Sequence, residues 1–140
     1  MKQNTKTMAG IIAAMIGIVI AGALLLFLFR DITMAPTFLV ANGTLKVTDT
    51  YSVQIPLDGA TLQLQTGAAA FAARVAGTSM GNIRKGWYRM DGVEGNVYAS
   101  LMDDTQDSIL LVSGGKRYYL NCRTPQETES LFRELEDDVG

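Results

Sequence analysis

Histidine is absent from this 140-residue sequence, and cysteine occurs once, as Cys122. Without histidine the chain cannot build Ser-His-Asp or Cys-His catalysis, histidine metal sites or the usual physiological pH switch. A single cysteine excludes an intramolecular disulfide. The formal net charge of −2 gives no overall positive field that would attract nucleic acid. We therefore expect no enzyme activity, no cofactor, no metal site and no nucleic-acid partner.

Charged residues are missing from residues 9–29, which read AGIIAAMIGIVIAGALLLFLF. At 1.5 Å per residue a helix over this run is about 30 Å long, the thickness of the hydrocarbon core of a bilayer. The alternative is a cleavable signal peptide, whose apolar region is usually shorter and ends at a small-x-small site. Here Ala35 is followed by Pro36, a poor cleavage junction. The pattern favours a short tail over residues 1–8 and an uncleaved transmembrane helix over 9–29.

Basic residues on either side of this helix indicate its orientation. Lys2 and Lys6 precede it, whereas Arg30 beyond it is offset by Asp31. Counting only lysine and arginine, the slight bias places the N-terminus in the cytoplasm. We expect a single-pass protein of the cell membrane whose remaining residues lie outside the cytoplasm.

Small residues recur every four positions along the predicted helix, at Ala13, Gly17 and Ala21. This spacing lets two membrane helices approach closely, which would produce a homodimer. Alanine and glycine are also common in membrane spans for other reasons. Self-association through this face and mere abundance of small residues both remain open.

A linker over residues 30–37 leads to the predicted domain, residues 38–140, in which apolar and polar residues alternate. Alternation with a period of two is typical of half-buried strands. The Ala-rich run 67–76 fits either a helical turn or a flattened strand. About six or seven strands are expected, over residues 45–48, 52–57, 61–65, 86–90, 95–102, 108–112 and 116–121.

The end of the chain carries a helix-start pattern. Thr124 can cap, Pro125 suits the first helical position, and Glu127 can complete a capping box. Leu131 and Leu135 lie four residues apart and give one apolar face. The predicted fold class is α+β: one N-terminal transmembrane helix, then a bent antiparallel sheet or barrel with one C-terminal helix.

This order of elements and several short motifs resemble the bacterial pleckstrin-homology-like domains, in particular the family often found beside membrane-spanning segments. The resemblance covers roughly residues 38–138 and rests on segments 55–57, 77–79, 83–89, 109–112, 118–121 and 124–132. It implies a pleckstrin-homology-type barrel with a C-terminal helix, no catalytic activity and no functional residue to transfer. Eukaryotic members often bind inositol phosphates through a basic first loop. Here that loop, residues 47–52, holds Asp49 and no lysine or arginine.

The stretch TSMGNIRKGWYRM, residues 78–90, gathers glycines, basic residues and aromatics. Gly81 and Gly86 have the spacing of a phosphate-binding loop, but Trp87 and Tyr88 stand where that motif requires Lys and Ser or Thr. We expect the glycines to serve backbone geometry and Trp87 or Tyr88 to fill the core.

Three basic side chains in this stretch remain as a candidate site: Arg84, Lys85 and Arg89. Placed in a turn where Arg84 and Lys85 reach solvent, they would contact an anionic surface close to the membrane. The alternative is a solvated rim without a ligand.

Two functions therefore remain open. The first is a non-enzymatic, membrane-tethered interaction module that binds a protein partner or itself, for example by accepting an added strand at a sheet edge. The second is the binding of anionic lipid or a small ligand at the basic turn 84–89.

Overall fold

The computed structural model describes residues 2–139, and the chain divides into two compact units, one ending at Asp31 and one beginning at Ile32. Helix α1 (Lys2–Thr33) extends beyond the predicted span at both ends. Its stretch Asn4–Thr33 is long and apolar enough to cross a membrane, and none of that window is buried inside the protein. A helix with no polar face and no covering side chains is the form that a membrane span takes.

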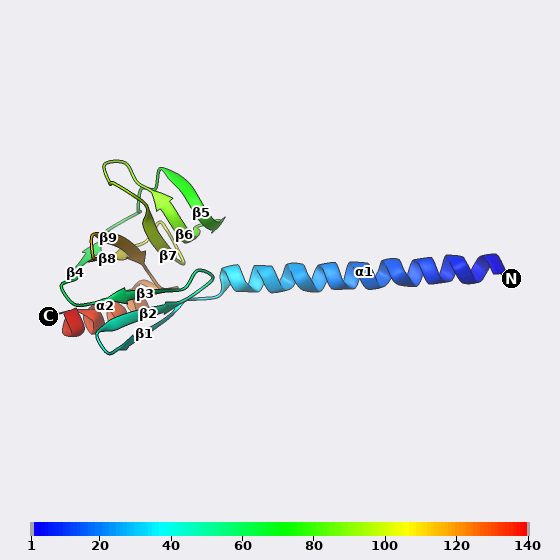
Figure 1. The fold of residues 1–140 in the computed structure, drawn as a ribbon, viewed down its shortest axis with the longest axis horizontal. Helices are drawn as coiled ribbons and strands as arrows, with labels where there is room; N and C mark the ends of the chain where they lie inside the picture. The colour runs from blue at the N-terminus through cyan, green and yellow to red at the C-terminus, as the bar shows by residue number, and fades with distance from the viewer. Residues whose placement is uncertain (1, 140) are drawn as a thin grey trace. The chain divides into compact units, whose positions relative to one another are not determined.

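The second unit contains nine strands and one helix within the described residues (Figure 1). This arrangement confirms the predicted α+β class, an N-terminal apolar helix followed by sheet and a C-terminal helix. The elements are β1 (Thr37–Ala41), β2 (Thr44–Thr48), β3 (Val53–Pro56), β4 (Thr61–Gln65), β5 (Ala73–Met80), β6 (Ile83–Arg89), β7 (Val97–Leu101), β8 (Ser108–Ser113), β9 (Lys116–Leu120) and α2 (Pro125–Val139).

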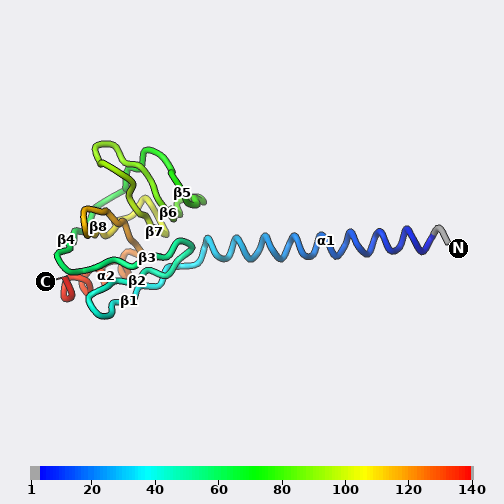
Figure 2. The backbone as a smooth tube through the Cα atoms, in the orientation of Figure 1, coloured from blue at the N-terminus to red at the C-terminus, as the bar shows by residue number. Residues whose placement is uncertain are grey.

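The strands form a three-stranded sheet in the order β1-β2-β3 and a six-stranded sheet in the order β4-β8-β9-β7-β6-β5. All pairs are antiparallel except β7 and β9, which are parallel. The connection over residues 66–72 runs from one edge of the larger sheet to the other, since β4 and β5 are its two edge strands (Figure 2). Because β7 and β9 are parallel, the larger sheet is mixed rather than a simple antiparallel meander.

Two strands lie where the sequence analysis expected none or left the choice open. Strand β1 pairs with β2 across the two-residue turn Asn42-Gly43, in which both residues have positive φ, 53° and 71°. That dipeptide is a strong hairpin signal, and it falls at the point where the alternating pattern was taken to begin. Strand β5 begins at Ala73, so the Ala-rich run is irregular up to residue 72 and extended afterwards.

The main core fills the space between the two sheets and α2. It combines side chains of the three-stranded sheet, such as Leu45 and Ile55, with Ile109 and Leu120 of the larger sheet and Leu135 of α2. Thr124 Oγ1 accepts a hydrogen bond from the Glu127 amide, so the predicted cap of α2 is confirmed. Burial of one apolar stripe of α2 explains why this acidic helix stays docked.

A second, smaller core lies on the opposite face of the six-stranded sheet. Tyr88 and Tyr119 are buried there, and Phe71 packs on both rings at centroid distances of 4.9 and 5.7 Å. The Ala-rich segment supplies Phe71 and Ala69 as the cover of this face. The expectation that Trp87 or Tyr88 fills a core is thus confirmed by Tyr88.

Glycines allow β5 and β6 to approach more closely than other residues would permit. Gly77 and Gly86 face each other across the pair, with φ of 146° and 123°. A Cβ on Gly86 would lie 2.4 Å from the Ala76 carbonyl oxygen, and one on Gly77 would lie 2.2 Å from that of Lys85. Gly86, one of the two glycines of residues 78–90, and Gly77 just before that stretch therefore serve the backbone geometry of the β5–β6 pair.

We predict that Gly86→Ala destabilises the domain by roughly 3–5 kcal/mol, because backbone overlap adds to an unfavourable φ. Gly81→Ala is the matched control: its φ of 56° is also positive, but no atom lies within 4 Å of the added Cβ. The control should lose only about 1–2 kcal/mol. Urea unfolding of the full chain in micelles, followed by tryptophan fluorescence, measures both losses. Equal losses of unfolding free energy for the two variants would show that the close approach of β5 and β6 does not contribute to stability.

Candidate functional site

The three predicted basic residues do not form an exposed basic turn. The turn of the β5–β6 hairpin is Gly81-Asn82, so Arg84, Lys85 and Arg89 all lie within β6. Lys85 points inward and is 1% exposed, which corrects the expectation that it reaches solvent. Arg84 bonds the Asp104 carboxylate at 2.7 Å. Arg89 alone of the three is exposed, with no ion pair among residues 2–139.

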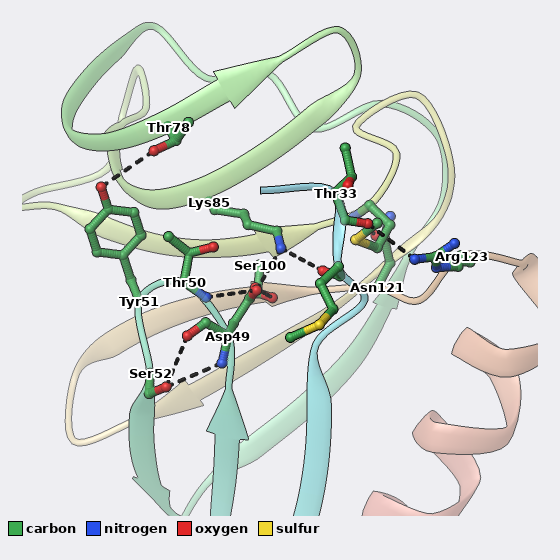
Figure 3. A network of polar contacts seen from close by, with 12 residues as sticks. Thr33, Asp49, Thr50, Tyr51, Ser52, Thr78, Lys85, Ser100, Asn121 and Arg123 are labelled. Carbon is green, nitrogen blue, oxygen red and sulfur yellow. Dashed lines mark hydrogen bonds and ion pairs between the residues drawn. The ribbon is translucent and has the colours of Figure 1, made fainter. Parts of the chain in front are cut away.

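Lys85 instead belongs to a buried polar cluster centred on Asp49 (Figure 3). Its Nζ lies 2.6 Å from Asp49 Oδ1, and the side chains of Lys85 and Asp49 are 1% and 2% exposed. Ser100 Oγ donates to Asp49 Oδ2 at 2.6 Å, and the Thr50 amide donates to Oδ1 at 2.8 Å. Both carboxylate oxygens are therefore satisfied without solvent, as a buried charge requires.

This cluster joins four parts of the domain unit. Asp49 comes from the β2–β3 loop, Lys85 from β6 and Ser100 from β7, while Lys85 Nζ also donates to the Met34 carbonyl at 2.7 Å. Arg123 donates to the neighbouring Thr33 carbonyl at 3.1 Å. The cluster thus ties the small sheet to the large one and holds the segment that precedes β1.

Tyrosine 98 extends the cluster towards the surface. Its hydroxyl donates to the Tyr51 carbonyl, and the Tyr51 hydroxyl lies 3.4 Å from Thr78 Oγ1. Burial, and to a lesser degree the Asp49 charge, raise the pKa of the Tyr98 phenol, so it remains a protonated donor at physiological pH. Tyr98 therefore serves as a hydrogen-bond donor to the Tyr51 carbonyl.

An open cleft of about 570 Å³ lies above Tyr98. Its volume is within the range of sites for small molecules or short peptides. Trp87 and Tyr118 are half-buried on either side of Tyr98, each with its ring centroid 5.8 Å from that of Tyr98. The remaining lining residues are one apolar residue, two glycines and five polar or charged residues: Val53, Gly95, Gly115, Gln54, Glu94, Asn96, Lys116 and Arg117.

Cys122 lies away from this cleft, beside α2. Burial, and then the nearby Glu127 carboxylate, raise the pKa of its thiol above the ordinary value. A raised pKa leaves little thiolate at neutral pH. Among the described residues no group of three or more His, Cys, Asp or Glu could hold a metal ion.

The residues predicted for helix self-association, Ala13, Gly17 and Ala21, all lie on α1 and are exposed. A Cβ on Gly17 would meet no atom within 4 Å. Residues spaced by four lie on one face of a helix. Because all three residues are exposed, a second helix can reach this face. Self-association remains a prediction.

The cleft residues were not identified from the sequence. Trp87 was considered only as core, while Lys116, Arg117 and Tyr118 were assigned to the closing hairpin. The parallel pairing of β7 and β9 places Tyr98 opposite Tyr118. No local pattern indicates such a pairing, so the sequence carried no direct signal of this site.

A scan against protein-family models finds no match to the chain, and searches of curated proteins and of solved structures find none either.

We predict that Lys85→Met lowers the free energy of unfolding by about 3–5 kcal/mol, because it leaves the Asp49 charge buried without a counter-ion. Adding Asp49→Leu should recover part of this loss, since the unpaired charge is then removed. Arg133→Met is the control: it breaks the exposed pair with Glu129, in which Arg133 is 72% exposed, and should cost at most about 0.5 kcal/mol. Urea unfolding of the full chain measures all four proteins. Similar losses for Lys85→Met and Arg133→Met would contradict the assigned role.

Proposed function

We propose that this chain is a non-enzymatic, single-pass membrane protein that presents an interaction module, and that the module binds its partner in the cleft above Tyr98. The observation that carries this proposal is the composition of the cleft. It combines partly exposed aromatic rings, charged side chains and a sheet edge in one hollow of about 570 Å³. Concave sites with aromatic walls and a few polar groups are where proteins usually hold ligands.

The buried cluster supports a binding role over a catalytic one. Asp49 and Lys85 are a carboxylate and an amine side by side, as an acid–base pair would be, but both side chains are almost fully buried and bonded to each other. Ser100 is fully buried and donates to the same carboxylate. A substrate cannot reach these groups without opening the domain, so their arrangement supports rigidity of the cleft wall.

The second candidate function, binding of anionic lipid or a small ligand at the basic turn 84–89, has less support from the structure. It required Arg84 and Lys85 in solvent, whereas Lys85 is buried and Arg84 is bonded to Asp104. Arg89, the one exposed residue of the three, would add only about 1 kcal/mol to the free energy of binding to an anionic membrane surface. The resemblance to bacterial pleckstrin-homology-like domains remains a prediction, and the proposal does not depend on it.

For the membrane arrangement we propose an N-terminus in the cytoplasm and the strand-rich unit outside it. The support is the excess of Lys2 and Lys6 over Arg30 at the ends of α1. A partner of the cleft would then belong to the cell envelope or the exterior.

We predict that a C-terminal reporter active only after export gives signal and that a cytoplasm-only reporter gives none. Replacing Lys2 and Lys6 by Gln should shift part of the population to the opposite orientation, because the positive charges that retain the N-terminus are lost. Arg133→Gln, which removes one charge 100 positions beyond the end of α1 at Thr33, is the control. Signal from the cytoplasmic reporter alone would refute the proposed orientation.

We predict that a photoreactive phenylalanine analogue at Tyr118, in the full chain in native membranes, gives a discrete adduct. The same analogue at Leu39, exposed on edge strand β1, is the control and should give none. Trp87→Ala in the Tyr118 protein should abolish the adduct, because it removes one wall of the cleft. An adduct of twice the chain mass would identify a second copy as the partner. Failure of Tyr118 to form any adduct would refute the proposed site.

A further inference from the structure

One wall of the cleft is the edge of β3, whose outward main-chain groups can be identified from the hydrogen-bond register. The Leu57 amide donates to the Gly43 carbonyl at 2.8 Å, so this pair is of the hydrogen-bonded kind. Antiparallel partners alternate between hydrogen-bonded and non-bonded pairs. Gln54 and Lys46 are three pairs further along the register, so they form a pair of the non-bonded kind. Its amide and carbonyl point away from β2, and neither has a main-chain partner among the described residues.

The available edge is short. Pro56 has no amide hydrogen, and its carbonyl already accepts a hydrogen bond from Ser113 Oγ. One residue of an added strand can therefore bond Gln54 in the usual two-bond manner, and the strand cannot continue past Pro56. This geometry suits a short extended segment.

The rim of the cleft is charged, with Lys116 and Arg117 from the start of β9 and Glu94 from the loop before β7. None of the three has an ion pair within residues 2–139. The two cations outnumber the single carboxylate, so the charges of the rim favour an anionic ligand. Trp87 and Tyr118 line the same cleft and are only half-buried, so an aromatic or aliphatic side chain can pack on their rings.

We propose that the cleft binds a short extended peptide that carries a carboxylate next to an aromatic or large aliphatic residue. The peptide adds to β3 at Gln54, places its apolar side chain between Trp87 and Tyr118, and directs its carboxylate to Lys116 and Arg117. This inference rests on the proposed function, because it names the class of partner for the same cleft. Strand addition supplies main-chain bonds, and the pockets for alternate side chains supply specificity.

The free Gln54 edge favours a peptide over an acidic sugar. Sugars also stack on aromatic rings, but one residue of an antiparallel peptide strand presents its own carbonyl and amide on the same side, where they match the outward amide and carbonyl of Gln54. The cleft offers both of these groups beside the aromatic surface.

The test uses the full chain in micelles and titrates it with the end-blocked hexapeptide Gly-Ser-Asp-Phe-Asp-Ser. Trp87 is the only tryptophan in the sequence, so its emission reports directly on the cleft. Calorimetry in parallel detects binding that leaves the emission unchanged. Saturable binding is expected, and the same peptide with Asn in place of both Asp residues should bind about fivefold more weakly.

Two series of variants examine the predicted contacts. Lys116→Gln combined with Arg117→Gln should weaken the Asp peptide about fivefold and abolish its advantage over the Asn peptide. Arg133→Gln, on the exposed face of α2, is the charge-matched control and should have no effect. Peptides with one N-methyl group at successive central positions test the edge. Methylation at the single residue opposite Gln54 should weaken binding about fivefold, and methylation of its neighbours should not.

Several results would overturn this inference: no binding by either method, equal affinity for the Asp and Asn peptides, or uniform tolerance of N-methylation. Binding of a galacturonate trisaccharide in place of the peptide would assign the cleft to acidic sugars. An adduct at Tyr118 in membranes together with failure of these peptides would retain the interaction module and reject the peptide class. Failure of both experiments would reject both.

Discussion

The buried contact between Lys85 and Asp49 holds together parts of the domain that are distant in sequence. The two residues are 36 positions apart, and Ser100 is 51 positions from Asp49. An ion pair removed from water gives little net stability, but loss of either partner leaves an unsatisfied charge. The pair therefore contributes chiefly to the specificity of the fold. Only the arrangement that brings the small sheet, β6 and β7 together satisfies Asp49, Lys85 and Ser100 at once. The cleft wall formed by Tyr98 and Trp87 follows directly from that arrangement.

The aromatic residues connect this cluster with the surface. Tyr98 lies next to the Asp49 cluster, with the half-buried Trp87 and Tyr118 on either side of it, so the floor of the cleft is held by a buried hydrogen bond and by ring contacts. A rigid aromatic floor loses little conformational entropy when a ligand packs on it. For the proposed peptide, the charged rim and the short β3 edge would supply direction and register. The proposed binding surface and its structural support are thus parts of one site.

The sequence predicted what depends on local pattern and missed what depends on long-range pairing. A charge-free run, period-two alternation and the cap at Thr124 are local, and they indicated the apolar helix, most strands and α2. The inward orientation of Lys85 depends on the position of the Gly81-Asn82 turn, which shifts the residue from a loop into β6. The cleft depends on the parallel pairing of β7 with β9. Such pairing joins residues about 20 positions apart and leaves no periodic trace in either strand.

The strand order also determines when the domain can be completed during synthesis. The hairpins β1–β2, β5–β6 and β8–β9 close over short loops, but β4 must wait for β8, and β7 must wait for β9. Pairings of large sequence separation form late, because closing a long loop costs entropy before contacts compensate for it. Until β8 is synthesised, the edge of β4 has no strand to pair with in the larger sheet. The last strand to be synthesised, β9, therefore adds the parallel pair and the basic rim of the cleft in a single step, and α2, which follows it, completes the main core.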